Sequence, residues 1–317
     1  MVLCFLCIRL KDGFAEGKDL VVTAMASMGE DQICALKDIR VHLFRFLSGI
    51  SDFLFVDEKI PEKIQKAAAN SNSNNLTLDE VREALIRQED TIVFRLIQRA
   101  NFPVNSPTYD EKFASFSGSL LQFVVKETEA LQSKVGRYEN PEEQPFSPEN
   151  LPPSLVPPQA DPPVLHPAAA SININEKIWD FYFNQLLPLF AVPGDDGNYA
   201  STASSDLDCL QAISRRIHYG YYVAEVKFKD APQDYEPAIR AQDREGLMKL
   251  LTFEAVEEMV KKRVEKKAAV FGQDVCLVDN GNGKYKVDPS VVSRLYGEWI
   301  MPLTKLVQVE YLLRRLD

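Results

Sequence analysis

Apolar residues recur at helical spacing along most of this chain. A capping box formed by Thr77 and Glu80 begins the first clear stripe, which continues to about residue 100. A second stripe covers 117–136, and ten of the nineteen prolines then fall between residues 141 and 167. Because proline lacks an amide hydrogen and clashes inside a helix, that proline-rich stretch is predicted to be an extended connector.

Helical patterns continue through the C-terminal half, separated by breaks rich in Gly, Pro or Asp. We predict helices over 174–191, 204–219, 221–229, 233–250, 253–271 and 288–316. Alternation typical of strands is nearly absent, with KYKV at 284–287 as the exception. The sequence shows no fixed-period repeat, so a single all-α, multi-helix domain over 76–317 is predicted.

Residues 1–75 carry no pattern that assigns them a role. Within them, AANSNSNN at 68–75 is a polar, low-complexity linker. The first residues, MVLCFLCIRL, are apolar but too short to span a bilayer, and no convincing signal-peptide cleavage site follows. The segment also contains more acidic residues and fewer serines than an organellar transit peptide. We therefore expect an N-terminal extension, poorly ordered in part, on a cytoplasmic protein.

Composition narrows the classes of partner. The 317 residues are 45% hydrophobic and 26% charged, which is ordinary for a soluble globular protein. A formal net charge of −10 argues against nucleic acid or an anionic membrane as the main partner, because both need a broad basic surface. Five scattered cysteines and three histidines show no metal-ligand spacing, so no metal site and a reducing compartment are expected.

Polar residues on otherwise apolar helical faces indicate where chemistry lies. ISRRIHYGYYVAEVKF at 213–228 places Arg216 and Lys227 on two such faces, joined at Gly220. A lone cation of this kind usually reaches water along its apolar stem. The same pattern recurs in three other predicted helices, at Arg82, Glu257, Thr304 and Gln308.

Together these six side chains predict a polar pocket inside a helix bundle that suits a small dianion bearing a hydroxyl. The sequence contains no GxSxG elbow, phosphate loop, HExxH motif or dinucleotide fingerprint. His218 has no Ser or Cys nucleophile in motif context near it, so we expect it to be structural. The pattern favours a reaction that needs orientation and charge stabilisation without a nucleophile, a metal or a cofactor.

Four segments resemble a known family: VREALIRQEDTIVFRLIQRA at 81–100, KVGRYENPEEQPF at 134–146, LQAISRRIHYGYYVAEVKF at 210–228 and PLTKLVQVEYLLRRLD at 302–317. On these segments the chain is similar to the all-helical chorismate mutases of yeast and plants over about three quarters of its length. A further segment, DAPQDYEPAIRAQD at 230–243, is most like the cytosolic plant members.

The resemblance implies a cofactor-free, homodimeric isomerase that converts chorismate to prephenate by a Claisen rearrangement, in Phe and Tyr biosynthesis. Two alternatives stay open at this point. One is a plastidic member of the family that is regulated by effectors. The other is a catalytically inactive helical interaction protein of the same fold.

The resemblance also implies roles for the six residues. Arg82 and Arg216 would hold the two carboxylates, with help from Thr304. Lys227 would donate to the ether oxygen, and Glu257 would accept from the ring hydroxyl. Gln308 stands where fungal members have a Glu that must be protonated to donate to the ether oxygen. Because an amide donates at any pH, activity is expected to persist from about pH 6 to about pH 8.5.

Regulated members bind aromatic amino acids at a site in the dimer interface. The positions of this chain that match that site are Val135, Gly136, Arg137, Asn198, Ala200, Ser201 and Ser204. Regulated relatives have Gly where this chain has Ala200, and a Cβ there can clash with a ligand or disfavour a positive φ. We therefore expect weak or absent control by Trp, Phe and Tyr.

Overall fold

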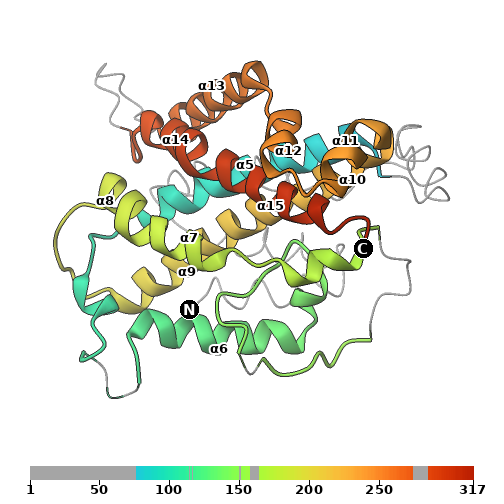
Figure 1. Cartoon of the computed structure of the whole chain (residues 1–317). Helices are drawn as coiled ribbons and strands as arrows, with labels where there is room; N and C mark the ends of the chain where they lie inside the picture. Colours follow the sequence, from blue (N-terminus) through green and yellow to red (C-terminus); the bar gives the residue numbers. More distant parts are fainter. Residues whose placement is uncertain (1–75, 114, 116, 150, 158–163, 274–284) are drawn as a thin grey trace, which may run out of the picture. The chain divides into compact units, whose positions relative to one another are not determined.

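The computed structural model describes residues 76–113, 115, 117–149, 151–157, 164–273 and 285–317 (Figure 1). The chain divides into two units, Met1–Asn74 and Asn75–Asp317, and all described residues belong to the second. The N-terminal extension expected over 1–75, including its polar linker, lies outside the described residues.

The first two long helices begin where local capping signals predict. Helix α5 (Leu78–Arg99) starts at the reciprocal capping box of Thr77 and Glu80. Helix α6 (Leu120–Lys134) starts at an equivalent box formed by Ser119 and Gln122. A short 3-10 turn, η1 (Ser106–Tyr109), lies between them.

The proline-rich connector follows the sequence prediction. Two 3-10 turns, η2 (Arg137–Glu139) and η3 (Pro167–Ser171), flank it, and its described residues contain no α-helix. Pairing typical of strands is limited, among the described residues, to an isolated bridge between Gln273 and Tyr285. The strand suggested by KYKV is thus reduced to one bridging residue, and Lys284 lies outside the described residues.

Five helices follow in the middle of the chain: α9 (Tyr199–His218), α10 (Gly220–Asp230), α11 (Pro232–Arg240), α12 (Arg244–Leu251) and α13 (Glu254–Phe271). Helix α9 begins five residues before its predicted start, because its first turns carry small and polar residues without an apolar stripe. The single helix predicted over 233–250 is divided into α11 and α12. Gln242 adopts a φ of 53°, and the side chain of Asp243 caps α12 by accepting from the amide of Gly246.

Two predicted helices are interrupted by π-turns. The 174–191 prediction becomes α7 (Asn175–Phe181), η4 (Tyr182–Leu186) and α8 (Leu187–Phe190). The 288–316 prediction becomes α14 (Pro289–Leu295), η5 (Tyr296–Ile300) and α15 (Met301–Leu313).

A proline stands two residues beyond each π-turn, Pro188 in one case and Pro302 in the other. Proline cannot donate to the carbonyl four residues earlier and its ring clashes with it. A wider turn accommodates that ring while the helix axis continues.

The main apolar core lies where α9, α10 and α15 pack together beside α5 (Figure 1). Ile213 and Ile217 of α9 are buried in this core with Leu96 of α5 and Val307 of α15. A smaller core joins α6 to the first half of α9. The all-α fold class predicted from the sequence is therefore confirmed. Among the described residues, no helix is both long and apolar enough to cross a membrane.

Candidate active site

Three of the predicted site residues are buried together where α9 meets α15. Arg216 is 5% exposed, and Thr304 and Gln308 are also buried. The Nη1 atom of Arg216 lies 3.4 Å from the Thr304 hydroxyl oxygen, to which it donates. Thr304 and Gln308 are four residues apart and therefore occupy one face of α15. The apolar stripes of the sequence thus identify three side chains that the fold brings to one place.

Gly220 allows α10 to approach α15 closely at this point. A Cβ on residue 220 would lie 2.9 Å from the backbone oxygen of Thr304 and 3.4 Å from Cγ of Gln308. Carbon atoms do not approach a backbone oxygen so closely without a shift of the neighbouring helix. The absent side chain of Gly220 therefore sets the distance between the helices that carry the site.

Arg216 and Gln308 each have a buried polar atom without a partner. Nε of Arg216 and Oε1 of Gln308 form no hydrogen bond with any described residue. The Nε2 atom of Gln308 donates to the Thr304 carbonyl oxygen at 3.3 Å, which leaves its second hydrogen available. Burial also lowers the pKa of Arg216. Unpaired buried polar groups are costly, so these atoms suit a ligand with an anionic oxygen and further hydrogen-bonding groups.

Lys227 projects from α10 and lies close to an aromatic ring. Its Nζ is 4.6 Å from the ring centroid of Phe253, and it forms no hydrogen bond or ion pair within the described part of the chain. Burial, together with the nearby positive charge of Arg82, lowers the pKa of Lys227 to about 8. The ammonium is thus a partly desolvated cation with unused donors.

Arg82 does not lie on a buried face, contrary to the sequence expectation. Its side chain is 62% exposed and forms an ion pair with Asp79 at 3.0 Å. The residue stands in the second turn of α5, where the predicted stripe is only partly covered by other helices. Its charge nevertheless acts on Lys227, so Arg82 lies at the edge of the same group.

Glu257 is half-buried near the start of α13 and is paired with a lysine that the sequence analysis did not single out. Nζ of Lys305 lies 2.8 Å from the Glu257 carboxylate and 3.3 Å from the hydroxyl of Thr252. Lys305 follows Thr304 on α15. This helix therefore carries the site residues Thr304 and Gln308 and also holds Glu257 through the Lys305 ion pair. No local pattern marks Lys305, because its partners lie about fifty residues earlier.

A second charged cluster behind Arg216 was also missed. Glu89 is fully buried on α5 and accepts from Arg263 at 2.9 and 2.6 Å, while Lys267 lies 3.1 Å away. The charges of Glu89 and Arg263 both act on Arg216. Arg263 follows Lys261 and Lys262 in a run of charges that is typical of a solvated face, whereas its guanidinium binds this carboxylate. Glu89 stands seven residues after Arg82 and therefore on the same helical face, and this spacing could have identified it from the sequence.

His218 has the structural role that was expected. The backbone amide of Ile174 donates to Nε2 at 3.1 Å, so the proton is on Nδ1, which lies 2.9 Å from the Ser214 carbonyl oxygen. Burial lowers the pKa of His218 to about 4, which keeps the ring neutral. Both ring nitrogens are therefore occupied: Nε2 ties α9 to the segment before α7, and Nδ1 bonds within α9.

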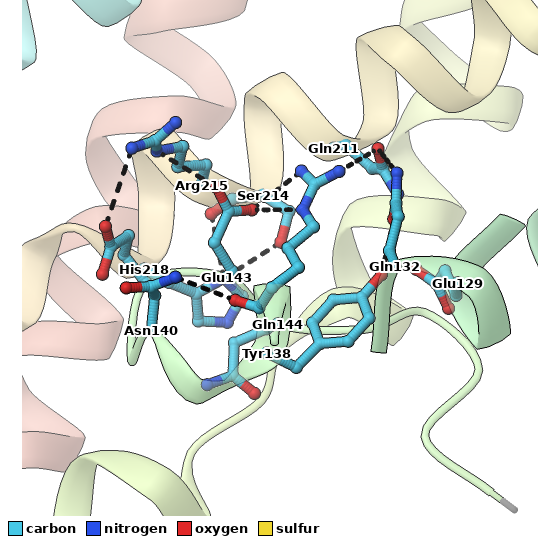
Figure 2. Close-up of polar contacts among 12 residues, drawn as sticks. Glu129, Gln132, Tyr138, Asn140, Glu143, Gln144, Gln211, Ser214, Arg215 and His218 are labelled. Carbon is cyan, nitrogen blue, oxygen red and sulfur yellow. Dashed lines mark hydrogen bonds and ion pairs between the residues drawn. The ribbon is translucent and has the colours of Figure 1, made fainter. Parts of the chain in front are cut away.

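The predicted effector residues fall into two groups. Arg137 donates from two nitrogens to Glu143, at 3.0 and 2.8 Å, and from the third to Gln211 at 2.7 Å. Figure 2 shows this network, in which Gln211, Gln132 and Tyr138 form a continuous chain of contacts. The neighbouring Val135 is exposed, and Gly136 has a φ of 80°.

The second group is Asn198, Ala200, Ser201 and Ser204, all exposed at the start of α9. Ala200 and Gln211 are eleven residues apart on this helix, which corresponds to about 16 Å. One chain therefore does not bring Ala200 and Arg137 together.

Other features of the described chain are less suited to an anion. An apolar cavity of about 460 Å³ is lined by Tyr109, Leu121, Trp179 and Phe183, among others, and no charged side chain lines it. Among the described residues, no group of three or more His, Cys, Asp or Glu could hold a metal ion. The charged group around Arg216 and Lys227 is thus the best-supported candidate for an active site.

Comparisons with known proteins point to the same region. A family model described as chorismate mutase type II matches residues 198–309, which include five of the six candidate residues. Chorismate mutase 2 of Arabidopsis thaliana is 68% identical over 252 residues, covering 77% of this chain and 95% of that protein.

Relatives named for two compartments are equally similar. The cytosolic chorismate mutase 2 of Zea mays is 55% identical over 78% of this chain and 99% of its own. The chloroplastic chorismate mutase 1 of Petunia hybrida is also 55% identical, over 77% of this chain and 78% of its own.

A solved structure shares the fold. The crystal structure of AtCM1 with tyrosine bound in its allosteric site is 53% identical and covers 78% of this chain and 99% of its own, with a TM-score of 0.71. Because a relative with 68% identity aligns over almost its whole length, the chain belongs to the chorismate mutases of plants and yeast.

Proposed function

We propose that this chain converts chorismate to prephenate in the site formed by Arg216, Lys227 and the residues around them. The observation that carries the proposal is the buried guanidinium of Arg216, whose Nε has no partner among the described residues and whose Nη1 reaches Thr304. Chorismate is a dianion with a ring hydroxyl and an ether oxygen. Its rearrangement breaks one C–O bond as one C–C bond forms, so no nucleophile is required.

The residues have distinct parts in this reaction. Arg216, with Thr304, holds one carboxylate in a fixed plane. Arg82 holds the other carboxylate after its side chain leaves Asp79. Lys227 donates to the ether oxygen, where negative charge grows as the C–O bond breaks. Glu257 accepts from the ring hydroxyl, and Lys305 keeps its carboxylate in place.

Holding the substrate in a chair-like conformer contributes much of the rate. Hydrogen bonds to charged groups contribute about 1.5–3 kcal/mol each. A few that strengthen in the transition state amount to about 8 kcal/mol, which corresponds to about a millionfold rate increase.

Two residues set the pH range of activity. The amide of Gln308 donates to the ether oxygen without needing a proton from solution. Lys227 must be charged to donate, and its pKa is lowered to about 8. The plateau expected to continue to about pH 8.5 is therefore revised for kcat/KM, which should fall to half its maximum at about pH 8 because kcat/KM reports the free enzyme. Bound dianionic substrate favours the charged ammonium, so kcat extends to higher pH.

Weak or absent control by Trp, Phe and Tyr is part of the proposal. All three guanidinium nitrogens of Arg137 are already engaged by Glu143 and Gln211. In the second group of positions that match the effector site, at the start of α9, Ala200 adds a Cβ where regulated relatives have Gly. AtCM1 binds tyrosine in its allosteric site, so the comparison leaves this point to measurement. An increase of about tenfold in activity on adding Trp would refute it.

A homodimer in the cytoplasm completes the proposal. Leu131 and Val135 are more than half exposed at the end of α6, which packs mainly against α9 and the turns η1 and η2 in the described part of the chain. Such apolar residues suit an interface with a second copy. Light scattering on purified protein tests the dimer. Import into isolated plastids, compared with the chloroplastic relatives, tests the alternative compartment.

The central experiment follows chorismate consumption and prephenate formation by purified protein, with and without Trp, Phe and Tyr. Turnover that is lost in Arg216→Leu, with unchanged thermal unfolding, is the expected result. A folded, dimeric protein without turnover would refute the proposed activity and would favour the inactive interaction protein of the same fold.

A further inference from the structure

An aromatic ring that belongs to neither the predicted site nor the apolar core lies against Lys227. Phe253 precedes α13 as its N-terminal cap residue, and its side chain is 53% exposed. A single exposed aromatic ring is ordinary on a protein surface. This ring is different because its centroid is 4.6 Å from Nζ of Lys227, a distance typical of a cation over an aromatic face.

Among the described residues, the ring is the one interaction partner of that ammonium. Within the described residues, Nζ of Lys227 has neither a carboxylate nor a hydrogen-bond acceptor. An ammonium on a flexible four-carbon stem would otherwise sample many directions. The face of the ring attracts the cation without accepting a conventional hydrogen bond, so the ammonium hydrogens stay available for an oxygen on the other side.

The turn that carries the ring is fixed from both sides. The Phe253 carbonyl oxygen accepts from the amides of Val256 and Glu257, both at 3.0 Å. The adjacent Thr252 donates to the Met248 carbonyl oxygen at 2.7 Å and accepts from Lys305. Lys305 belongs to α15, the helix that carries Thr304 and Gln308. The backbone of Phe253 is therefore anchored to the same helices that form the candidate site.

We propose that Phe253 is a positioning residue whose ring covers the Lys227 ammonium and keeps it directed into the site. The role rests on the proposed function, because it prepares the cation that donates to the ether oxygen. It extends that function by assigning the orientation of Lys227 to an aromatic side chain outside the set of polar residues.

The charges near Lys227 define what the ring must offset. Arg82 of α5 repels the ammonium, and burial disfavours its charged form. Helices α5, α9, α11 and α15 pack against α10, and α13 follows Phe253. The buried titratable groups of the four helices packed against α10 are Glu89, Arg99, Asp206, Cys209, Arg216, His218, Tyr235 and Tyr311. The exposed Arg82 is the group whose charge lowers the pKa of Lys227. Glu257 is already paired with Lys305, so it does not neutralise Lys227 in the free protein. Attraction by the ring therefore supports the charged form that catalysis needs.

Kinetic comparison of Phe253→Leu with Phe253→Tyr tests the proposal. Leucine keeps an apolar group over Lys227 but removes the aromatic face, whereas tyrosine keeps the face. We expect Phe253→Leu to lower kcat by about 5- to 30-fold with little change in KM, because the contact acts in the transition state. The alkaline limb of kcat/KM should also move to lower pH, since the ring no longer favours the charged form. Phe253→Tyr should retain both properties.

Met259→Ala is the matched control. Met259 is also a large exposed apolar residue and lies on α13, and it has no aromatic ring to offer to Lys227. Its variant should match the unmodified enzyme in kcat, KM and pH profile. If Phe253→Leu and Phe253→Tyr behave alike, the positioning role is refuted while the proposed function stands. If the unmodified enzyme does not consume chorismate, the proposed function fails, and the positioning role fails with it.

A measurement without substrate checks the contact itself. Reductive methylation with ¹³C-formaldehyde labels lysine amines, and Lys227→Arg assigns the resonance of Lys227 by its loss. A methyl group over an aromatic face shows an upfield ring-current shift. That shift should be present in the unmodified protein and in Phe253→Tyr and absent in Phe253→Leu. An unshifted resonance in the unmodified protein would overturn the proposal.

Discussion

Gly220→Ala tests whether the close approach of α10 to α15 is required for activity. The new Cβ would lie 2.9 Å from the Thr304 carbonyl oxygen and 3.1 Å from its Cγ2, and the first of these atoms is backbone. Relief of that contact requires a shift of a few tenths of an ångström between the helices. Overpacking of this kind costs about 1–3 kcal/mol. Replacing Gly by Ala within a helix returns about 0.5–1 kcal/mol.

The net loss of stability is therefore small beside the roughly 5–15 kcal/mol that keeps a domain folded. Catalysis should suffer more, because the shift moves Thr304 and Gln308 away from Arg216 and Lys227. Loss of one hydrogen bond to a charged group, about 1.5–3 kcal/mol, corresponds to a fall of about 10- to 160-fold in kcat/KM. The assay is chorismate consumption, with thermal unfolding measured on the same preparations.

Gly297→Ala is the control for this experiment. A Cβ at residue 297 meets the flexible side chain of Lys261, at 3.0 Å from its Cδ, and no backbone atom. It should leave kcat/KM unchanged. If Gly220→Ala keeps the kcat/KM and thermal stability of the unmodified protein, the argument that Gly220 sets the helix distance is wrong.

Three further outcomes are expected. Lys227→Ala should lower kcat at least about 100-fold with a nearly unchanged unfolding temperature, since the ammonium forms no ion pair or hydrogen bond in the described residues and contacts the exposed ring of Phe253. Near-normal kcat would contradict its role. Gln308→Glu should introduce a steep loss of kcat/KM above about pH 6.5, because the new carboxyl group must be protonated to donate. A pH profile like that of the unmodified enzyme would argue against a contact between residue 308 and the ether oxygen. Arg99→Leu should destabilise the fold by about 3–5 kcal/mol in urea titrations, because it leaves the buried carboxylate of Asp206, now 2.6 Å from Nε of Arg99, without its charge partner. In the last case, Arg99→Leu combined with Asp206→Asn should recover part of the loss, and a double variant no more stable than the single one would show that the charge is not the cause.

Periodicity predicted the burial of Arg216, Thr304 and Gln308 correctly. These residues lie on long helices whose stripes are covered along that part of their length. The same reasoning failed for Arg82, since a stripe reveals a face but not where along the helix its neighbours end. Burial of a residue near a helix terminus depends on tertiary packing that no local pattern contains.

Long-range ion pairs could not be predicted from helical periodicity, for a related reason. Glu89 and Arg263 are 174 residues apart, and Glu257 and Lys305 are 48 residues apart. Helical periodicity reports neighbours three or four residues away and says nothing about such pairs. The division between α11 and α12, in contrast, could have been predicted from the sequence, because Asp243 is a strong helix-capping residue before Gly246.

The π-turn at Tyr296–Ile300 has a consequence for how much length variation the chain tolerates. A π-turn contains more residues than an α-helical turn, and each residue rotates an α-helix by about 100°. Five residues of a π-turn rotate the chain about as far as four residues of an α-helix, so this turn takes up one residue without changing which face of α15 carries Thr304 and Gln308. Active relatives should therefore tolerate the loss of one residue here, whereas an inserted residue would rotate Thr304 and Gln308 by about 100° away from Arg216.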